Sequence, residues 1–282
     1  MTSPDLPLAC TVRDCGLPLT RTATSYSCPR GHSYDIARSG YVNLLQPQDR
    51  RSKTPGDSKL AVTARARLEE SGVGHEALEQ ILGQVATLDL TERPTVVDLG
   101  SGTGNALAQF AARRSIAGIG IDLAIAAADF AARRFRELTW IVANADRRLP
   151  LLDQSIDVVV SLHGRRNPAE SARILKPSGF LLVAVPAPDD LIELRRFVQG
   201  EAIARERINT VIAEHELHFA IVKRFEARQR GHVEREALLD LLRATYRGAR
   251  SRVSDRVEKL ASLDVTIASD CVLMAPATDS RG

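Results

Sequence analysis

From residue 95 onward, buried strands and helices alternate along the chain, and this rhythm limits the fold more than any other feature. Apolar runs of strand length lie at 95–99, 117–121, 139–143, 156–162 and 180–186. Segments with helical spacing of apolar residues separate them at 105–114, 124–136 and 168–175. Strands joined by helices are typical of βαβ units, so we predict an α/β fold with a parallel sheet covered on both faces.

A glycine-rich loop lies between the first strand and the first helix of this region. Its pattern is Asp98-x-Gly100-x-Gly102-x-Gly104, and Asp122 ends the next predicted strand. Glycines allow the backbone to turn tightly and approach a ligand, while the helix N-terminus offers free N–H groups. An acid at the end of the second strand can accept hydrogen bonds from both hydroxyls of a ribose. The pattern therefore predicts a site for NAD or S-adenosylmethionine.

Three details favour S-adenosylmethionine over NAD. An acid precedes the glycines, in place of a plain Gly-x-Gly-x-x-Gly motif. Asn144-Ala145-Asp146, after the third strand, can place a polar side chain near the adenine amine. The Leu-Lys-Pro-Ser-Gly turn at 175–179 is similar to the turn before a strand in class I methyltransferases. We therefore predict a class I, Rossmann-like methyltransferase domain rather than a dehydrogenase.

Four potential metal ligands lie near the start of the chain. Cys10 and Cys15 are followed, after a gap of twelve residues, by Cys28 and His32. Three thiolates and one imidazole suit tetrahedral Zn²⁺, and a complete set of four protein ligands is typical of structural rather than catalytic sites. Metal binding would supply the folding free energy that so small a segment lacks. The sequence therefore predicts a zinc-binding module in front of the methyltransferase domain.

These patterns divide the chain into three predicted regions. They are a zinc-binding knuckle at 1–46, a linker with two leading helices at 47–90, and the S-adenosylmethionine-dependent domain at 91–282. The leading helices are expected at 59–70, capped by Ser58, and at 75–88. Later segments are predicted as helices at 191–213 and 234–244 and as a final strand at 265–274.

The charge of the chain is only mildly basic. Its 282 residues carry a formal net charge of +3, which permits an anionic partner without requiring one. Basic residues gather at 50–59 and at 243–256, and either group could contact phosphates. The N-terminus has no basic start followed by an apolar run, and no stretch is long and apolar enough to span a bilayer. We therefore expect a cytoplasmic protein with no membrane partner.

Together these features resemble the ribosomal RNA large-subunit guanine-N1 methyltransferase family, which includes housekeeping and macrolide-resistance members. The resemblance rests first on the zinc knuckle followed by Tyr-Val-Asn-Leu-Leu at 41–45. It continues in the Pro-Gly-Asp-Ser loop at 55–58 and in the segments 167–170 and 186–194, so it covers nearly the whole chain. The chain departs from the family where Cys-x4-Cys replaces Cys-x2-Cys, where His-Gly-Arg-Arg at 163–166 replaces an aromatic-Ala-Pro segment, and around 244–247. The last two places should face the target base.

The resemblance implies S-adenosylmethionine as methyl donor, structural Zn²⁺ at Cys10, Cys15, Cys28 and His32, and N1 of a guanine in 23S rRNA as the target. Because that nucleotide must leave its stack, an RNA hairpin loop is the expected substrate. The predicted cofactor-binding residues are Asp98, Gly100, Gly102, Thr103, Gly104, Asp122, Asp146 and Asp190. No general base is assigned, and the candidates for accepting the N1 proton are Asp57, His163 and Asp190.

Several hypotheses stay open at this point. The zinc knuckle either contacts RNA or only stabilises the fold. The enzyme could methylate another RNA or a small molecule, or the chain could be a non-catalytic RNA-binding protein with a methyltransferase-like fold. Members of the family can act as dimers, so a homodimer is a further expectation.

Overall fold

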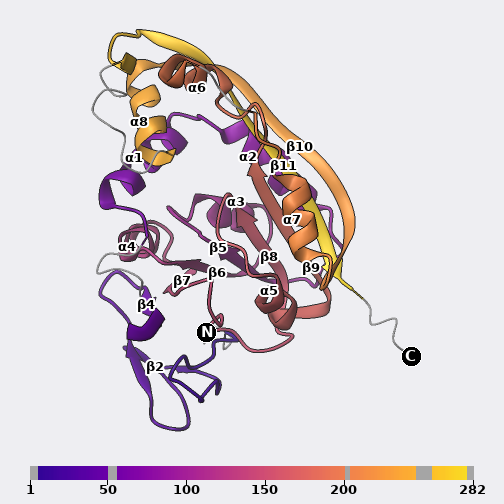
Figure 1. Ribbon diagram of the computed structural model, residues 1–282. Helices are drawn as coiled ribbons and strands as arrows, with labels where there is room; N and C mark the ends of the chain where they lie inside the picture. The colour runs from indigo at the N-terminus through magenta and orange to yellow at the C-terminus, as the bar shows by residue number, and fades with distance from the viewer. Residues whose placement is uncertain (1–5, 50–55, 201–203, 246–255, 278–282) are drawn as a thin grey trace.

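The computed structural model describes residues 6–49, 56–200, 204–245 and 256–277 (Figure 1). An eight-stranded sheet forms its centre, with the strand order β10-β11-β9-β8-β5-β6-β7-β4. Five neighbouring pairs, from β9 to β4, are parallel, whereas β11 pairs antiparallel with both β9 and β10. The predicted α/β class is confirmed, but the sheet is mixed rather than wholly parallel.

The strands of this sheet differ greatly in length. They are β4 (Val42–Asn43), β5 (Thr95–Leu99), β6 (Ala117–Asp122), β7 (Thr139–Val142), β8 (Ile156–Leu162), β9 (Leu175–Pro186), β10 (Phe219–Glu234) and β11 (Ser262–Pro276). The helices are α1 (Lys59–Glu70), α2 (His75–Ala86), α3 (Asn105–Arg113), α4 (Ile125–Arg134), α5 (Pro168–Ile174), α6 (Ile192–Gln199), α7 (Ile208–His215) and α8 (Arg235–Thr245).

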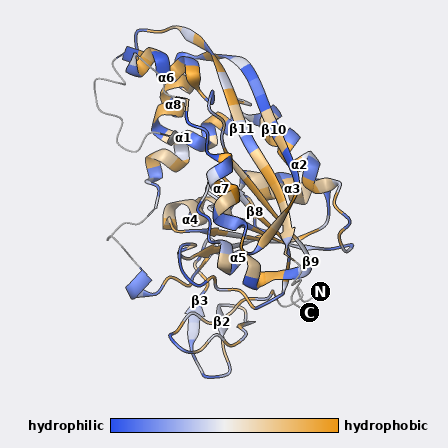
Figure 2. Cartoon of the chain, turned by 45° about the vertical axis from the view of Figure 1, so that its right-hand side comes forward, coloured by the Kyte–Doolittle hydropathy of each residue, from blue (hydrophilic) through white to orange (hydrophobic). Residues whose placement is uncertain are grey.

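The two faces of the sheet belong to two separate hydrophobic clusters, because successive side chains of a strand point to opposite faces. Val96 and Val158 pack with α2, α3 and α4 on one face. Val97 and Val159 pack with α5, α7 and the N-terminal segment on the other. Figure 2 shows the resulting pattern, in which central strands are mainly hydrophobic and the outer elements carry many hydrophilic residues.

Two sequence predictions for the second half need correction, and one long strand was missed. The segment 191–213 is not one helix, since Gly200 adopts a φ of +84° and ends α6 before α7 begins. Strand β9 begins at Leu175, because the predicted turn at 175–179 is already part of the strand and Leu175 pairs with Ile156. The long strand β10 was not predicted at all. It pairs antiparallel with β11 along the outer edge of the sheet, with α8 in the connection between the two strands (Figure 1).

The N-terminal segment forms a small three-stranded sheet of β1 (Thr20–Arg21), β2 (Ser25–Ser27) and β3 (Ser33–Asp35). A 3-10 helix, η1 (Pro47–Asp49), follows β4. Leu8, Leu19 and Tyr26 are buried in the same cluster as strands β5 and β6 of the large sheet. The N-terminal segment therefore shares the core of the main domain.

A helical lobe lies at the opposite end of the molecule, where α1, α6 and α8 surround a third hydrophobic cluster (Figure 1). The Arg67 guanidinium of α1 donates two hydrogen bonds, of 2.5 and 2.6 Å, to the carboxylate of Asp240 on α8. Among the described residues, no helix is long and apolar enough to cross a membrane.

Candidate functional site

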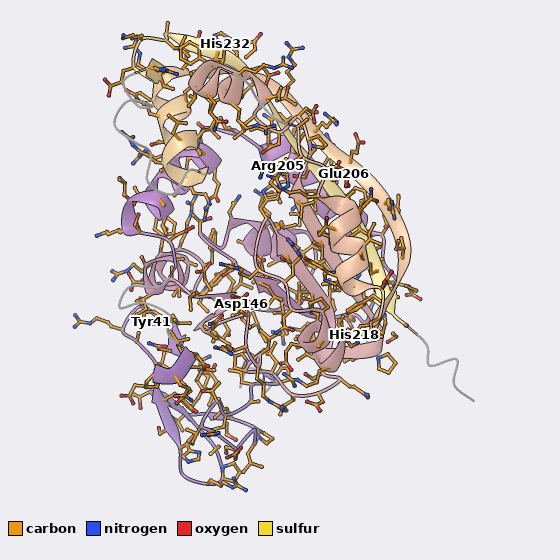
Figure 3. The ribbon with its side chains drawn as sticks, in the orientation of Figure 1. Tyr41, Asp146, Arg205, Glu206, His218 and His232 are labelled. Atoms are coloured by element: carbon orange, nitrogen blue, oxygen red, sulfur yellow. The ribbon has the colours of Figure 1, made fainter. Side chains whose placement is uncertain are left out.

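A cavity of about 990 Å³ lies where the parallel strands end, between the sheet and α1. Asp146 and Arg205, both labelled in Figure 3, belong to its lining. The cavity brings together seven of the eight predicted cofactor-binding residues, which are Asp98, Gly100, Gly102, Thr103, Asp122, Asp146 and Asp190. Asp57 and His163, the two candidates for a catalytic base, also line it. The roles of these residues stay predictions.

The glycine loop forms the floor of this cavity. Gly100, Gly102 and Gly104 all have positive φ angles, of 80°, 53° and 82°, which L side chains rarely adopt. The eighth predicted residue, Gly104, is not among the lining residues. Gly104 directly precedes α3, and a Cβ atom there would lie 2.5 Å from the ring of the buried Trp140. The absence of a side chain therefore allows the loop to pack closely on that ring.

Asp122 holds the glycine loop in place from the end of β6. Its Oδ2 accepts a hydrogen bond from the backbone N–H of Gly102 at 2.9 Å, and its Oδ1 accepts one from Ala124 at 2.7 Å. Burial raises the pKa of Asp122 despite these bonds. Burial and the nearby Asp122 carboxylate also raise the pKa of Asp98 to about 7. Two acids therefore sit close together in the lining of the cavity, where hydrogen-bond donors or positive charge from a ligand would be favourable.

Asn144 and Asp146 connect the cavity to the N-terminal segment. Asn144 is buried, and its Nδ2 donates a hydrogen bond of 3.0 Å to the backbone oxygen of Asp49. Its Oδ1 accepts a bond of 3.0 Å from the N–H of Asp146. Asp146 lies 3.7 Å from the guanidinium of Arg165. Asn144 and Asp146 both line the cavity, and Asn144 also braces the turn.

The candidate bases have different surroundings. His163 adopts a left-handed φ of 55°, and its Nε2 lies 2.8 Å from the Ser269 hydroxyl. Its ring is exposed to the open cavity but otherwise surrounded by protein. This desolvation, with the charges of Arg65 and Arg207, lowers its pKa to about 4, so the imidazole is neutral at pH 7.

Asp190 is less exposed than His163. Its Oδ1 accepts a hydrogen bond of 3.0 Å from Ala268, and burial raises its pKa to about 6. Asp57 instead forms a salt bridge of 3.1 Å with Arg65. The predicted helix cap at Ser58 is confirmed, since its Oγ accepts a hydrogen bond from the N–H of Ala61 at 3.2 Å.

Two cavity residues on α1, Arg65 and Glu69, were not predicted as site residues. Glu69 accepts a hydrogen bond from the Thr103 hydroxyl, and a Cβ atom at Gly102 would lie 3.0 Å from Nη1 of Arg65. Both side chains therefore lie against the glycine loop. Their spacing of one helical turn is visible in the sequence, but nothing there indicates that α1 covers the loop.

The places where the chain departs from the family's sequence pattern do reach the cavity. His163, Gly164, Arg165 and Ala244 line it. The residues 246 and 247, and the basic residues at 50–53, lie outside the described part of the chain. Of the late basic stretch, Arg243 pairs with Asp240 at 3.0 Å, and Arg256 donates to the backbone oxygen of Val198 at 2.7 Å.

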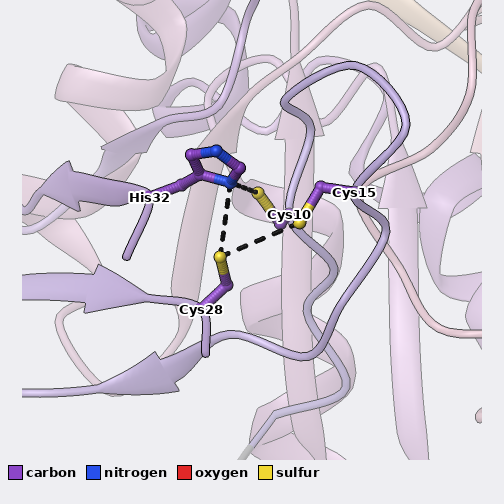
Figure 4. Close-up of side chains that lie close together, drawn as sticks. All are labelled: Cys10, Cys15, Cys28 and His32. Atoms are coloured by element: carbon purple, nitrogen blue, oxygen red, sulfur yellow. Dashed lines mark hydrogen bonds between the residues drawn. The ribbon is translucent and has the colours of Figure 1, made fainter. Parts of the chain in front are cut away.

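The four predicted metal ligands converge at the other end of the molecule (Figure 4). Their ligand atoms all lie within 4.8 Å of one another. Nδ1 of His32 is 3.4 Å from Sγ of both Cys10 and Cys28, and Sγ of Cys15 is 3.8 Å from that of Cys28. A tetrahedral zinc ion with ordinary bond lengths would separate two sulfurs by about 3.8 Å and a sulfur from a nitrogen by about 3.5 Å. The cluster therefore has the dimensions of a closed zinc site and includes Cys10.

Tyr34 supports this metal centre, a role that nothing in the sequence indicated. Its hydroxyl lies 3.1 Å from Sγ of Cys10 and accepts hydrogen bonds from the backbone N–H groups of Thr11 and Val12 at 3.1 and 3.2 Å. The hydroxyl can donate its proton to Sγ of Cys10 or to Oγ1 of Thr11, which lies 3.2 Å away. Such contacts orient a ligand and stabilise its negative charge.

Comparisons with known proteins find matches to both the N-terminal module and the methyltransferase domain. The family profile of the zinc ribbon described as "RlmA, N-terminal" matches residues 9–53, and a methyltransferase-domain profile matches residues 96–179. The 23S rRNA (guanine(748)-N(1))-methyltransferase of Streptomyces fradiae is 37% identical over 64% of this chain and 64% of its own length. The match thus spans a little under two thirds of that relative.

A second relative matches over more of its length. A candidate 23S rRNA (guanine-N1)-methyltransferase of Bacillus subtilis is 33% identical over 86% of this chain and 88% of its own. Among solved structures, a candidate methyltransferase of Bacillus halodurans aligns with a TM-score of 0.50 and 16% identity, covering 71% of this chain and 99% of that one. This structural likeness supports the class I methyltransferase fold alone.

Proposed function

Because this chain belongs to the 23S rRNA (guanine-N1)-methyltransferase family, we propose that it transfers a methyl group from S-adenosylmethionine to N1 of a guanine in 23S rRNA. One observation carries the proposal. A single cavity joins the glycine loop, the acid at the end of β6 and the polar turn after β7, in a chain that also holds a zinc-sized ligand cluster.

The residues of the cavity fit an adenosyl sulfonium donor. In this proposal Asp122 accepts hydrogen bonds from the ribose, Asp146 bonds the adenine, and the glycine loop lets the backbone approach the ligand closely. Bound S-adenosylmethionine supplies an electrophilic methyl group on a positively charged sulfur. The protein's contribution is to align the target nitrogen with that methyl group, and such positioning can lower a barrier by roughly 7–11 kcal/mol.

Methyl transfer forms a bond to N1 and breaks one to sulfur, so the N1 proton must leave. Asp190 is the best suited of the candidate acceptors in this cavity. Its pKa of about 6 makes it a stronger base than His163, with a pKa of about 4, and both are deprotonated at neutral pH. Asp57 is occupied by its salt bridge with Arg65.

The substrate is proposed to be a hairpin loop, whose unstacked guanine can enter the cavity. Arg165, Arg205 and Arg207 line the opening and would attract the RNA backbone. A ribosomal RNA substrate also fits the cytoplasmic location expected from the sequence. We further propose that the chain is divided into regions at 1–46, 47–90 and 91–282. The zinc module is proposed to contact the RNA, and the protein is proposed to form a homodimer.

Transfer of a labelled methyl group tests this function directly. The purified protein is incubated with labelled S-adenosylmethionine and 23S rRNA, and the modified base is located by mass mapping of RNA fragments. Gly102→Arg should reduce transfer to background, because the positive φ and the adjacent Arg65 exclude a side chain there. Gly83→Ala is the matched control, since a Cβ atom at that glycine meets no atom within 4 Å. Methyl transfer to a small molecule, or to no RNA, would contradict the proposal.

A further inference from the structure

Two opposite charges on α1 face the cavity one helical turn apart. Arg65 and Glu69 both belong to its lining, and both lie against the glycine loop. Residues four apart on a helix lie on the same face. Arg65 forms a salt bridge with Asp57 at 3.1 Å, and its Nη2 also donates a hydrogen bond to the backbone oxygen of Ala244 at 3.2 Å. The guanidinium is thereby held over Gly102.

Glu69 has an unused acceptor. Its Oε1 accepts from the Thr103 hydroxyl, but its Oε2 has no hydrogen-bond partner among the described residues. This oxygen is buried, and a buried acceptor without a partner is unfavourable by about 1–3 kcal/mol. Gln109 of α3, which also lines the cavity, has a second buried oxygen in the same condition. Neither oxygen is itself exposed to the cavity, so each would reach the N–H donors of a ligand only after a rotation of its side chain.

We propose that Arg65 and Glu69 together bind the amino-acid end of the methyl donor, with the guanidinium receiving its carboxylate and the Glu69 carboxylate receiving its ammonium. This inference rests on the proposed function, since it takes S-adenosylmethionine as the ligand. The amino-acid end carries one negative and one positive group on a single carbon. An arginine and a glutamate on adjacent turns are complementary to that pair.

The arrangement also gives the Thr103 side chain a role in donor binding. Its backbone belongs to the loop that approaches the donor, and its side chain fixes the carboxylate that binds the ammonium. Arg65 is fixed similarly, by Asp57. The two charged groups are therefore held in position before the donor arrives, which reduces the entropy lost on binding.

Calorimetry with three adenosyl ligands separates the two contacts. S-adenosylhomocysteine has both the ammonium and the carboxylate, decarboxylated S-adenosylmethionine has only the ammonium, and 5′-methylthioadenosine has neither. Glu69→Gln keeps an acceptor for Thr103 but loses the charge. It should weaken the first two ligands about tenfold or more and leave 5′-methylthioadenosine unchanged. Arg65→Gln should weaken S-adenosylhomocysteine alone.

The matched control is Glu70→Gln, which removes a carboxylate that pairs with Arg134 at 3.2 Å on the exposed side of α1. It should change none of the three affinities. Equal weakening of all three ligands by Glu69→Gln, or no weakening, would overturn the inference while leaving the proposed function intact. Failure of the unmodified protein to bind S-adenosylhomocysteine would overturn both. Should the variants not fold, equal affinity of the unmodified protein for S-adenosylhomocysteine and 5′-methylthioadenosine refutes the inference.

Discussion

The packing of Trp140 beneath the glycine loop makes Gly120→Ala a revealing substitution. A Cβ atom at Gly120 would lie 2.2 Å from Cζ3 of the indole and 2.9 Å from the Ser101 hydroxyl oxygen. Carbon atoms in contact are about 3.5–4.0 Å apart, so the ring would have to retreat by more than about 1 Å. Retreat is restricted, because the same ring lies against Gly104 and Nε1 donates to the Phe135 oxygen at 2.9 Å.

Overpacking of this kind destabilises a protein by about 1–3 kcal/mol. For a chain of 282 residues, which gains about 2.1 cal/mol/K of entropy per residue on unfolding, that corresponds to a fall in melting temperature of roughly 2–5 °C. The displaced ring also shifts Ser101 and Gly104, so the affinity for S-adenosylhomocysteine should fall as well. Thermal unfolding followed by circular dichroism measures the first effect, and calorimetry the second. Gly83→Ala again serves as control and should be neutral or slightly stabilising.

A double substitution tests the cause. Trp140→Leu alone leaves a cavity and an unpaired Phe135 oxygen, and should destabilise by about 2–4 kcal/mol. In the double variant, the methyl group added at Gly120 meets no indole ring. The double variant should therefore lose less stability than the sum of the two single losses, by about 1 kcal/mol or more. Additive losses, or a Gly120→Ala variant that melts like the unmodified protein, would refute the reasoning.

Three further predictions concern the metal and the acids. Removing zinc with a chelator, or Cys28→Ser, should lower the melting temperature of the whole chain in a single transition, because the zinc module shares the main core; a separate early transition would contradict this. Asp98→Asn should raise the free energy of unfolding of the donor-free protein by roughly 1–3 kcal/mol at pH 8. The gain should shrink as the pH falls below about 7, where folded Asp98 becomes protonated while the unfolded carboxylate is still charged. The single-turnover methylation rate should rise with pH through about 6 as Asp190 loses its proton, and Asp190→Asn should remove that step from the pH profile.

Much of the fold could be predicted, because the central elements have strong local signals. The bounds predicted for α1, β5 and β8 agree with the structure. Helix α1 begins with a capping serine, and β5 and β8 are continuous apolar runs buried on both faces. Strand β10 has no such signal. Apart from Phe219, Ala227 and Val233, its side chains are exposed or only partly buried, and its backbone pairing with β11 depends on residues about 40 positions away.

The candidate site shows the same division. The glycine loop and Asp122 are tied to strand ends, so their convergence follows from the topology of a parallel sheet. Arg65 and Glu69 come from a helix before the first strand of the domain, and only tertiary packing brings that helix over the loop. Gly104 shows a second role for a motif residue. It fits the sequence motif, and its lack of a side chain also makes room for the Trp140 ring, which the sequence did not indicate.

The zinc module is joined to the donor cavity through the outer strands of the sheet. Strand β4 pairs with β7, and the N–H of Leu44 donates to the Val142 oxygen at 3.0 Å. Directly after β7, Asn144 binds the Asp49 backbone on one side and supports the turn of Asp146 on the other. Metal binding at the ribbon therefore stabilises the strand that carries one wall of the cavity. An RNA held by the ribbon would thus be presented at a fixed orientation to the donor, which is the alignment that in-line methyl transfer requires.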